Sequence, residues 1–243
     1  AITLLYIYIA TMKQKLASNI PMMFIICVVA GGMMGAVISI ISDNVYVADT
    51  DSWDKPNNRV QKFDSSGNFL SKFGSSGNAD GRFPRRSPHG IGVDNNGNIY
   101  VSDTLAMSNH HRIQKFDSRG NFLGKWGSYG HADGLFNEPR GVAVDQDGNI
   151  YVAEMGNDRI QKFDSSGNFL MKSEAKHGVR LKQPSDIAVH NVSTCETAIY
   201  VLETSNRVSK ITVSKSAGGN KEALGRARLD YLRGDRSNEG NKG

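Results

Sequence analysis

Cysteine is scarce in this chain, and several familiar kinds of site are missing with it. Two cysteines in 243 residues, Cys27 and Cys195, cannot build a disulfide framework or a zinc site made of several cysteines. No Ser/His/Asp or Cys/His arrangement and no glycine-rich phosphate loop can be recognised from the spacing. The Asp-x-x-Gly-Asn segments are not EF-hand loops, because Asp145 is followed eleven residues later by Gly156 instead of Glu. We therefore expect no catalytic residue, no metal and no cofactor.

A strong charge of either sign is lacking as well. The chain has 29 Lys and Arg residues against 24 Asp and Glu residues, a formal net charge of +5. This balance attracts anionic surfaces mildly, and it selects none among nucleic acid, lipid headgroups and acidic glycans. Glycine is plentiful, with 26 residues, as in a turn-dense all-β protein. A hydrophobic content of 39% is ample for one domain with a sizeable core.

A unit of four short strands accounts for most of the chain, and residues 139–172 show it in full. Asp145–Gly148 and Asp164–Gly167 are expected turns, since Asp accepts a backbone hydrogen bond and the Gly can adopt positive φ. Strand runs of about five residues joined by such turns form an antiparallel meander. The runs Val142–Val144 and Ile150–Val152 are apolar throughout. Both faces of the sheet must therefore be covered, which stacked copies achieve.

Copies of the unit are present at regular intervals. The segment that begins at Arg59, RVQKFDSSGNFL, returns almost unchanged from Arg112 and Arg159, and in degenerate form from Arg207. A repeat of about 50 residues with four strands predicts the blades of a β-propeller. The predicted fold class is thus all-β, an arc of about three and a half four-stranded blades.

The repeated motifs resemble those of the NHL repeat family. They read P-x-G-[IV]-x-V-D, G-N-I-Y-V-[AS]-[DE] and N-x-R-[IV]-Q-K-F-D, and the resemblance runs from Asn44 to about Val213. It implies a propeller of radially arranged blades, six in the usual family member. It implies much less about activity, because propellers host unrelated functions.

The first and last blades read as incomplete. Blade one opens with Asn44–Ala48, which matches the second strand of the unit, so its inner strand is expected to be missing. Blades two (90–126) and three (141–172) have all four strands, whereas blade four ends at Arg207–Val213 without an outer strand. Three explanations are open: the arc is a fragment of a longer propeller, another chain completes the ring, or the arc stays open. Unpaired strand edges of this kind predict self-association.

An uncharged apolar segment, Ile20–Ile41, precedes the repeats. It is long enough to span a bilayer as a helix. Because Lys13 and Lys15 lie before it, the positive-inside rule predicts a cytoplasmic N-terminus and repeats outside the cytoplasm. A cleaved signal peptide with its cleavage site at Val37–Ser39 is an alternative, which would make the protein secreted, and a buried core helix is another.

Four segments follow from this reading. Residues 1–19 form a cytoplasmic segment, of which 1–11 precede Met12, the residue that resembles a native start. Residues 20–41 form a transmembrane or signal-anchor helix, and residues 43–213 form the blades. Residues 214–243 are a polar, basic tail for which we expect disorder or one short helix.

Charged residues that recur in every blade are expected to be structural. Each blade has an acidic residue before the loop that links strands two and three, and an arginine after it. An ion pair that braces this loop explains the recurrence. The four predicted pairs are Asp49 with Arg59, Asp103 with Arg112, Glu154 with Arg159, and Glu203 with Arg207.

Function is expected where the blades differ. Loops that link strands two and three, and loops that link consecutive blades, emerge on one rim, and they contain Trp53, Arg85, Arg86, His110 and His111. An exposed Trp with Arg and His on a rigid scaffold suits a binding surface. Ordinary divergence of loops, with Trp53 covering a blade edge, is the alternative explanation.

A second variable position lies just before each inner strand, where it faces the mouth of the central channel. The residues there are His89, Arg140 and Ser185. Enzymes that resemble the peptide-amidating lyase hold a metal at this place with several histidines, and this chain offers one. His110 and His111 are adjacent and make a poor chelating pair.

These observations predict a non-catalytic binding or scaffold module whose rim loops bind a protein, peptide or glycan outside the cytoplasm. One alternative function is a metal-dependent lyase of the peptide-amidating type. Another is an RNA-binding NHL domain, against which the predicted export of the chain argues, so nucleic acid is not the expected partner.

Overall fold

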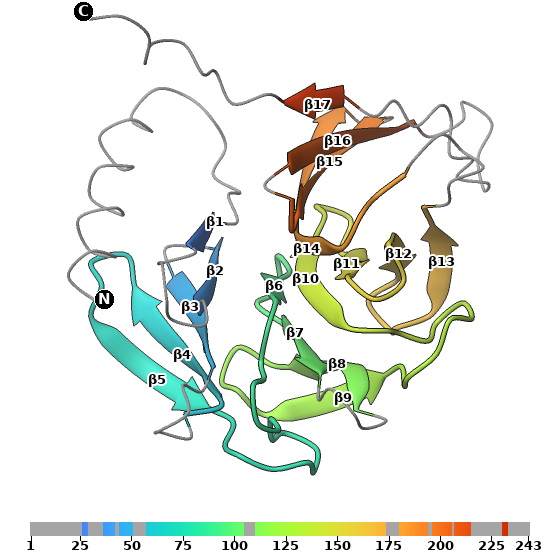
Figure 1. Ribbon diagram of the computed structural model, residues 1–243. Coiled ribbons are helices and arrows are strands. Elements are labelled where there is room, and N and C mark those ends of the chain that lie inside the picture. The colour runs from blue at the N-terminus through green and yellow to red at the C-terminus, as the bar shows by residue number, and fades with distance from the viewer. Residues whose placement is uncertain are drawn as a thin grey trace, which may run out of the picture.

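The computed structural model describes residues 26–28, 36–41, 44–50, 57–104, 110–173, 180–193, 196–205, 207–214 and 230–232, the first two and the last of these ranges by backbone alone. Every element in this part of the chain is a β-strand (Figure 1). The strands form four antiparallel sheets in which sequence neighbours pair with one another. The predicted all-β class is therefore confirmed.

Each sheet is a simple up-and-down meander. The first contains β1 (Ile26–Val28), β2 (Ala36–Ile41), β3 (Asn44–Asp49), β4 (Arg59–Asp64) and β5 (Phe69–Phe73). The second contains β6 (Ile91–Val93), β7 (Ile99–Thr104), β8 (His111–Phe116) and β9 (Phe122–Trp126). The third contains β10 (Pro139–Val144), β11 (Ile150–Glu154), β12 (Arg159–Phe163) and β13 (Phe169–Lys172). The fourth contains β14 (Pro184–Ser193), β15 (Glu196–Glu203), β16 (Arg207–Ser214) and β17 (Asp230–Leu232).

The Asp-x-x-Gly-Asn segments are the turns that the sequence predicts. In the turn between β8 and β9, one carboxylate oxygen of Asp117 accepts the backbone N–H groups of Arg119 and Asn121, and the other accepts the Asn121 side-chain amide. Gly120 completes this turn at a φ of 88°. These hydrogen bonds hold the pKa of Asp117 below its usual value, because they favour the carboxylate. The same pattern of bonds recurs at Asp64, Asp94, Asp145 and Asp164.

The four sheets follow one another around an arc, with β2, β6, β10 and β14 on its inner side (Figure 1). One apolar cluster fills each seam between neighbouring sheets, and its members come from the alternating inward positions of both sheets. The seam between the second and third sheets, for example, buries Tyr100, Val142 and Phe163 completely or almost completely. Stacking therefore covers both faces of each inner sheet, as the apolar runs require.

Inner strands of neighbouring sheets approach each other at glycine. A Cβ added to Gly90 would lie 2.1 Å from the carbonyl oxygen of Arg140 in the next sheet. At the same position of the following repeat, a Cβ on Gly141 would lie 2.7 Å from the Cα of Asp186. Asp186 itself occupies this position in the last sheet. Close contact with the next blade thus explains why the repeated P-x-G motif has Gly at this position.

The segment predicted to be a membrane helix contains strands, and this prediction is wrong for the residues described. Ala36–Ile41 forms β2, which pairs with β3 from Val37 to Ile41, and Ile26–Val28 forms β1 next to it. Val37, Ile38 and Ile40 are β-branched, and such residues suit a strand when a neighbouring edge is available. Within the described residues, no helix is long and apolar enough to cross a membrane. Blade one therefore has the inner strand that the repeat pattern lacked.

The last sheet is completed in a similar way. Asp230–Leu232, in the tail expected to be disordered or helical, forms β17 and pairs with Val208–Lys210 of β16. Both strand edges that were expected to be unpaired, along β3 and β16, are thus occupied at least in part. Within the residues described, the chain forms four blades of at least four strands each, where the sequence indicated about three and a half. Self-association stays a prediction, and unpaired edges on these two strands no longer support it.

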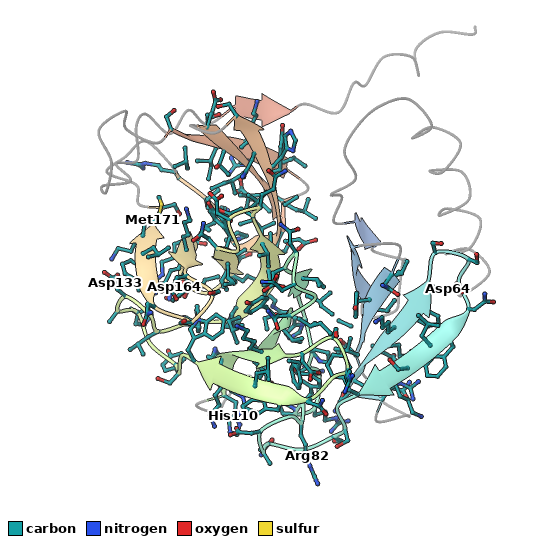
Figure 2. The ribbon with its side chains drawn as sticks, turned by 180° about the vertical axis from the view of Figure 1, so that it is seen from behind. Asp64, Arg82, His110, Asp133, Asp164 and Met171 are labelled. Atoms are coloured by element: carbon teal, nitrogen blue, oxygen red, sulfur yellow. The ribbon has the colours of Figure 1, made fainter. Side chains whose placement is uncertain are left out.

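The seam between the third and fourth sheets lacks an aromatic ring that the other seams contain. At the end of the outer strand, Phe73 packs on Gly120 of the next sheet, and Trp126 packs on Gly167 in the same manner. Ser173 occupies the equivalent position of the third blade, where it pairs with Ile160 through its backbone and its hydroxyl. A narrow, mainly apolar slot remains there, lined among others by Tyr151, Ile160, Met171, Ile199 and Ile211; Figure 2 labels Met171.

Ser173→Trp should therefore be more stable than Ser173→Ala, because both variants lose the serine hydroxyl and only Trp adds a ring at the slot. The indole ring would occupy the slot, and filling such a space contributes about 1 kcal/mol to the free energy of unfolding. Urea denaturation of the variant checks this. Ser173→Ala is the matched control, because it removes the hydroxyl that accepts the Ile160 N–H and should lower the free energy of unfolding by about 1 kcal/mol. Equal losses in both variants would show that this seam cannot accept the ring.

Candidate functional site

The two rims of the molecule carry different kinds of connection between strands. The Asp-x-x-Gly-Asn turns lie on one rim, whereas the loops between strands two and three and the loops between blades lie on the other. In Figure 2, Asp64 lies at one end of the first sheet, and Arg82 lies beyond its other end. The two kinds of loop touch on the loop-bearing rim, where the backbone of Met155 and Gly156 donates to the carbonyls of Glu138 and Asn137. The rim predicted to carry function is thus a single continuous surface at this seam.

The repeated ion pairs hold this rim together. All four pairs predicted from the sequence are present, with Nε-to-carboxylate distances of 2.8 Å for Arg59–Asp49, 2.7 Å for Arg112–Asp103, 2.6 Å for Arg159–Glu154 and 3.0 Å for Arg207–Glu203.

The carboxylate of Glu154 is fully buried and also accepts hydrogen bonds from Asn137, Asn157 and Gln161. Burial raises the pKa of Glu154, and the Arg159 charge acts in the opposite direction. This carboxylate therefore depends on its arginine for charge compensation.

The first two loops between blades contain residues 74–82 and 127–135, and arginine and glutamine side chains of the following blade brace them. Arg159 donates to the carbonyls of His131, Ala132 and Leu135, and Gln161 reaches the Leu135 carbonyl and the Gly134 N–H. In the preceding loop Arg112 and Gln114 make the corresponding bonds. The loops that link consecutive blades were expected to vary with function, and these two are consequently rigid supports.

His89 and Arg140, both predicted to face the mouth of the central channel, contact each other. Nη1 of Arg140 donates to Nδ1 of His89 across 3.1 Å. Burial, aided by the Arg140 charge, lowers the pKa of His89 to about 3. His89 is therefore a neutral acceptor at physiological pH. Ser185, the third residue predicted here, uses its hydroxyl to donate to the Leu202 carbonyl of its own sheet.

The contacts of Arg140 continue outward over the rim. Its Nη2 lies 3.7 Å from Oε2 of Glu138, beyond hydrogen-bond distance. The Glu138 backbone N–H in turn donates to Nδ1 of His111 across 2.9 Å. Burial lowers the pKa of His111, while the Glu138 charge partly opposes this effect. His111, which the sequence singled out, is thus a buried acceptor that holds the loop before β10.

An exposed aromatic residue ends this chain of contacts, and sequence reasoning missed it. Tyr129 is 50% exposed, and its ring lies edge-on to His111 at 5.1 Å and to His131 at 6.1 Å. His131 contacts Asn157 across 2.6 Å. A comparison of the two loops, SSGNADGRF and SYGHADGLF, would have found both, since Tyr129 and His131 replace Ser76 and Asn78. We call Tyr129, His111, Glu138, Arg140 and His89 the rim network.

The other predicted site residues lie elsewhere. Arg85 and Arg86 are exposed in the loop before β6, and Arg86 has a φ of 67°. His110 precedes β8 and contributes its charge to the surroundings of Asp103 and His111. Trp53 lies outside the described residues. Among the residues that the structure describes, no three His, Cys, Asp or Glu side chains gather as metal ligands would.

The family model of the NHL repeat matches residues 86–116 and 136–163. The chain thus contains two stretches that match the NHL repeat. The first matched range ends with β8 and the second with β12, so these NHL repeats supply His89, His111, Glu138 and Arg140 of the rim network. The resemblance seen in the sequence is confirmed for these ranges. No curated protein matched the chain.

The solved structures that match this chain differ widely from it in sequence. A structure described as streptogramin B lyase has a TM-score of 0.49 and 18% identity, covering 86% of this chain and 58% of that one. Regucalcin, a calcium-binding protein from Agrobacterium tumefaciens str. C58, has a TM-score of 0.45 and 15% identity, with coverages of 78% and 57%. A gluconolactonase from Xanthomonas campestris has a TM-score of 0.45 and 18% identity, with coverages of 70% and 56%. The chain spans less than two thirds of each of these three proteins.

Proposed function

We propose that this NHL-repeat protein is a non-catalytic binding module, and that the rim network between the second and third blades contacts its ligand, a protein or peptide. A glycan is the alternative ligand. The observation that carries the proposal is that half-exposed Tyr129 lies on the same rim as Arg140 and Glu138, whose side chains are 32% and 31% exposed.

Rigid presentation of these side chains supports binding. The loop that carries Tyr129 and His131 is held by Arg159 and Gln161 through the bonds described above, and Lys172 donates to Asp133 across 2.7 Å. Little conformational entropy is then lost when a partner docks. Tyr and Arg dominate the energetic centres of protein interfaces, since both offer a large contact area with polar ends. The composition therefore favours a protein or peptide.

The place of action is a separate question. The predicted location outside the cytoplasm, as a membrane-anchored or secreted protein, stays a prediction. Its basis was the uncharged apolar segment 20–41, parts of which form β1 and β2.

Replacing Tyr129 with Ala should weaken ligand binding about tenfold or more, because truncation of a central aromatic contact costs about 2 kcal/mol. Purified protein applied to arrays of synthetic peptides and of glycans, with bound protein measured by fluorescence, tests this. Phe69→Ala is the matched control, since Phe69 is 53% exposed on the outer strand β5. Retained binding by the Tyr129 variant, or no binding by the unchanged protein to either array, would contradict the proposal.

A further inference from the structure

The arginines of the second and third blades use their guanidinium groups very differently. Arg112 donates to five oxygen atoms, namely those of the Asp103 and Asp80 carboxylates and the carbonyls of Asn78, Ala79 and Arg82, at 2.7 to 3.5 Å. Arg159 likewise donates to both Glu154 oxygens and to three carbonyls, at 2.6 to 3.4 Å. A guanidinium has five N–H groups. Every guanidinium nitrogen of these two scaffold arginines therefore donates within the fold.

Arg140, by contrast, does not use all of its N–H donors within the fold. It makes one hydrogen bond, to His89, and its Glu138 contact of 3.7 Å is too long to be another. Its Nε is buried without a hydrogen-bond partner among the described residues, while 32% of the side chain is exposed. Burial lowers the pKa of Arg140, and the neighbouring Glu138 charge acts in the opposite direction. A partly desolvated cation with unused donors favours the binding of an anion at its exposed face.

The surroundings restrict which anion fits. Glu138 places one negative charge beside the guanidinium, so a dianion such as phosphate would be repelled more strongly than a monoanion. Two oxygens in one plane match the fork of N–H groups on arginine. His89 already takes one N–H through Nδ1 and adds no charge. A carboxylate satisfies these conditions.

We infer that Arg140 binds a carboxylate of a peptide or protein partner, at the channel-mouth end of the rim network. The inference rests on the proposed function, and it names the chemical group that the site recognises. Peptide is favoured over an acidic sugar because Tyr129, at the other end of the same network, supplies the aromatic contact typical of protein interfaces.

N-acetylglycine is a suitable probe, since it carries a peptide bond and one carboxylate. Titration followed by ¹⁵N–¹H NMR of the whole chain should show saturable shifts of the Arg140 side-chain signal and of the Gly90 and Gly141 amides. N-acetylglycinamide, its neutral analogue, and sodium chloride at equal ionic strength should give no saturable shift. Arg140→Gln should weaken binding at least tenfold, and Arg140→Lys should weaken it less, because Lys keeps the charge without the fork.

Arg119→Gln is the matched control, because Arg119 is exposed in a turn on the opposite rim. It should leave the titration unchanged, and thermal denaturation should show that the Arg140 variants remain folded. Equal binding by Arg140→Gln, or no saturable shift in the unchanged protein, would overturn the inference. So would tighter binding of glucuronate than of N-acetylglycine, since this result assigns the site to an acidic glycan. The array experiment with Tyr129→Ala tests the proposed function, and the titration tests the role of Arg140. Failure of one can therefore be distinguished from failure of the other.

Discussion

Gly90→Ala should destabilise the protein by about 3 kcal/mol, although it adds a single methyl group. That methyl would lie 2.1 Å from the Arg140 carbonyl oxygen and 2.8 Å from the Val142 nitrogen. Both atoms belong to the backbone of the neighbouring inner strand, which cannot turn aside as a side chain could. The second and third sheets must therefore separate, and their shared apolar seam loosens with them. Urea denaturation, followed by intrinsic fluorescence, measures the loss.

Gly124→Ala is the matched control. Gly124 lies within the outer strand β9, and a Cβ built there meets no atom within 4 Å. This substitution should leave the free energy of unfolding unchanged or raise it slightly, because Ala restricts the unfolded chain more than Gly does. If the two variants unfold at the same urea concentration, the inner strands are not in the close contact described above.

Arg159→Ala should cost about 3 to 5 kcal/mol, the range found when one partner of a buried ion pair is removed. It leaves the fully buried Glu154 carboxylate without its cation and frees the carbonyls of His131, Ala132 and Leu135. Arg140→Ala, by contrast, removes one hydrogen bond and a contact of 3.7 Å at a partly exposed position. We expect a loss of less than about 1 kcal/mol. Urea denaturation of both variants at pH 7 compares them.

The loss in free energy of unfolding caused by Arg159→Ala should depend on pH. Burial already raises the pKa of Glu154, and loss of the Arg159 charge raises it further. A carboxyl group whose pKa is higher in the folded than in the unfolded state binds more protons when folded. The free energy of unfolding of the variant therefore falls as pH rises above 4.5, the ordinary pKa of a glutamate side chain. It rises again when the pH is lowered towards that value. A deficit independent of pH, or one no larger than that of Arg140→Ala, would show that the Glu154 pair is not the brace of this rim.

Much of the architecture follows from the sequence because the contacts inside one blade are local. The pair Glu154–Arg159 spans five residues and the bonds of Asp117 span at most four, so each repeat of the motif repeats its contacts. Tyr and Lys of neighbouring strands show the same regularity, with the Lys nitrogen 5.3 Å from the ring centre in Tyr100–Lys115 and 5.2 Å in Tyr151–Lys162. Blades, turns and braces could thus be predicted before the structure was seen.

Contacts between blades could be predicted only in part. His89 and Arg140 were singled out because they vary at one position of the repeat, but their bond joins residues 51 apart and depends on how two sheets stack. Tyr129 was missed, since its ring becomes part of a site only when the loop folds over His111. The slot beside Ser173 is likewise visible only when three seams are compared.

The sequence by itself determined the repeat, the all-β class and the four ion pairs, because each depends on residues within one blade. Tertiary structure decided what the ends of the repeat region do. An uncharged apolar segment satisfies a helix and a strand equally well, and the free edge of β3 provides the backbone partners that make Ala36–Ile41 a strand. The edge of β16 does the same for Asp230–Leu232, in a tail whose composition suggested no strand. The rim network arises in the same manner, since stacking of the second and third blades brings its residues together.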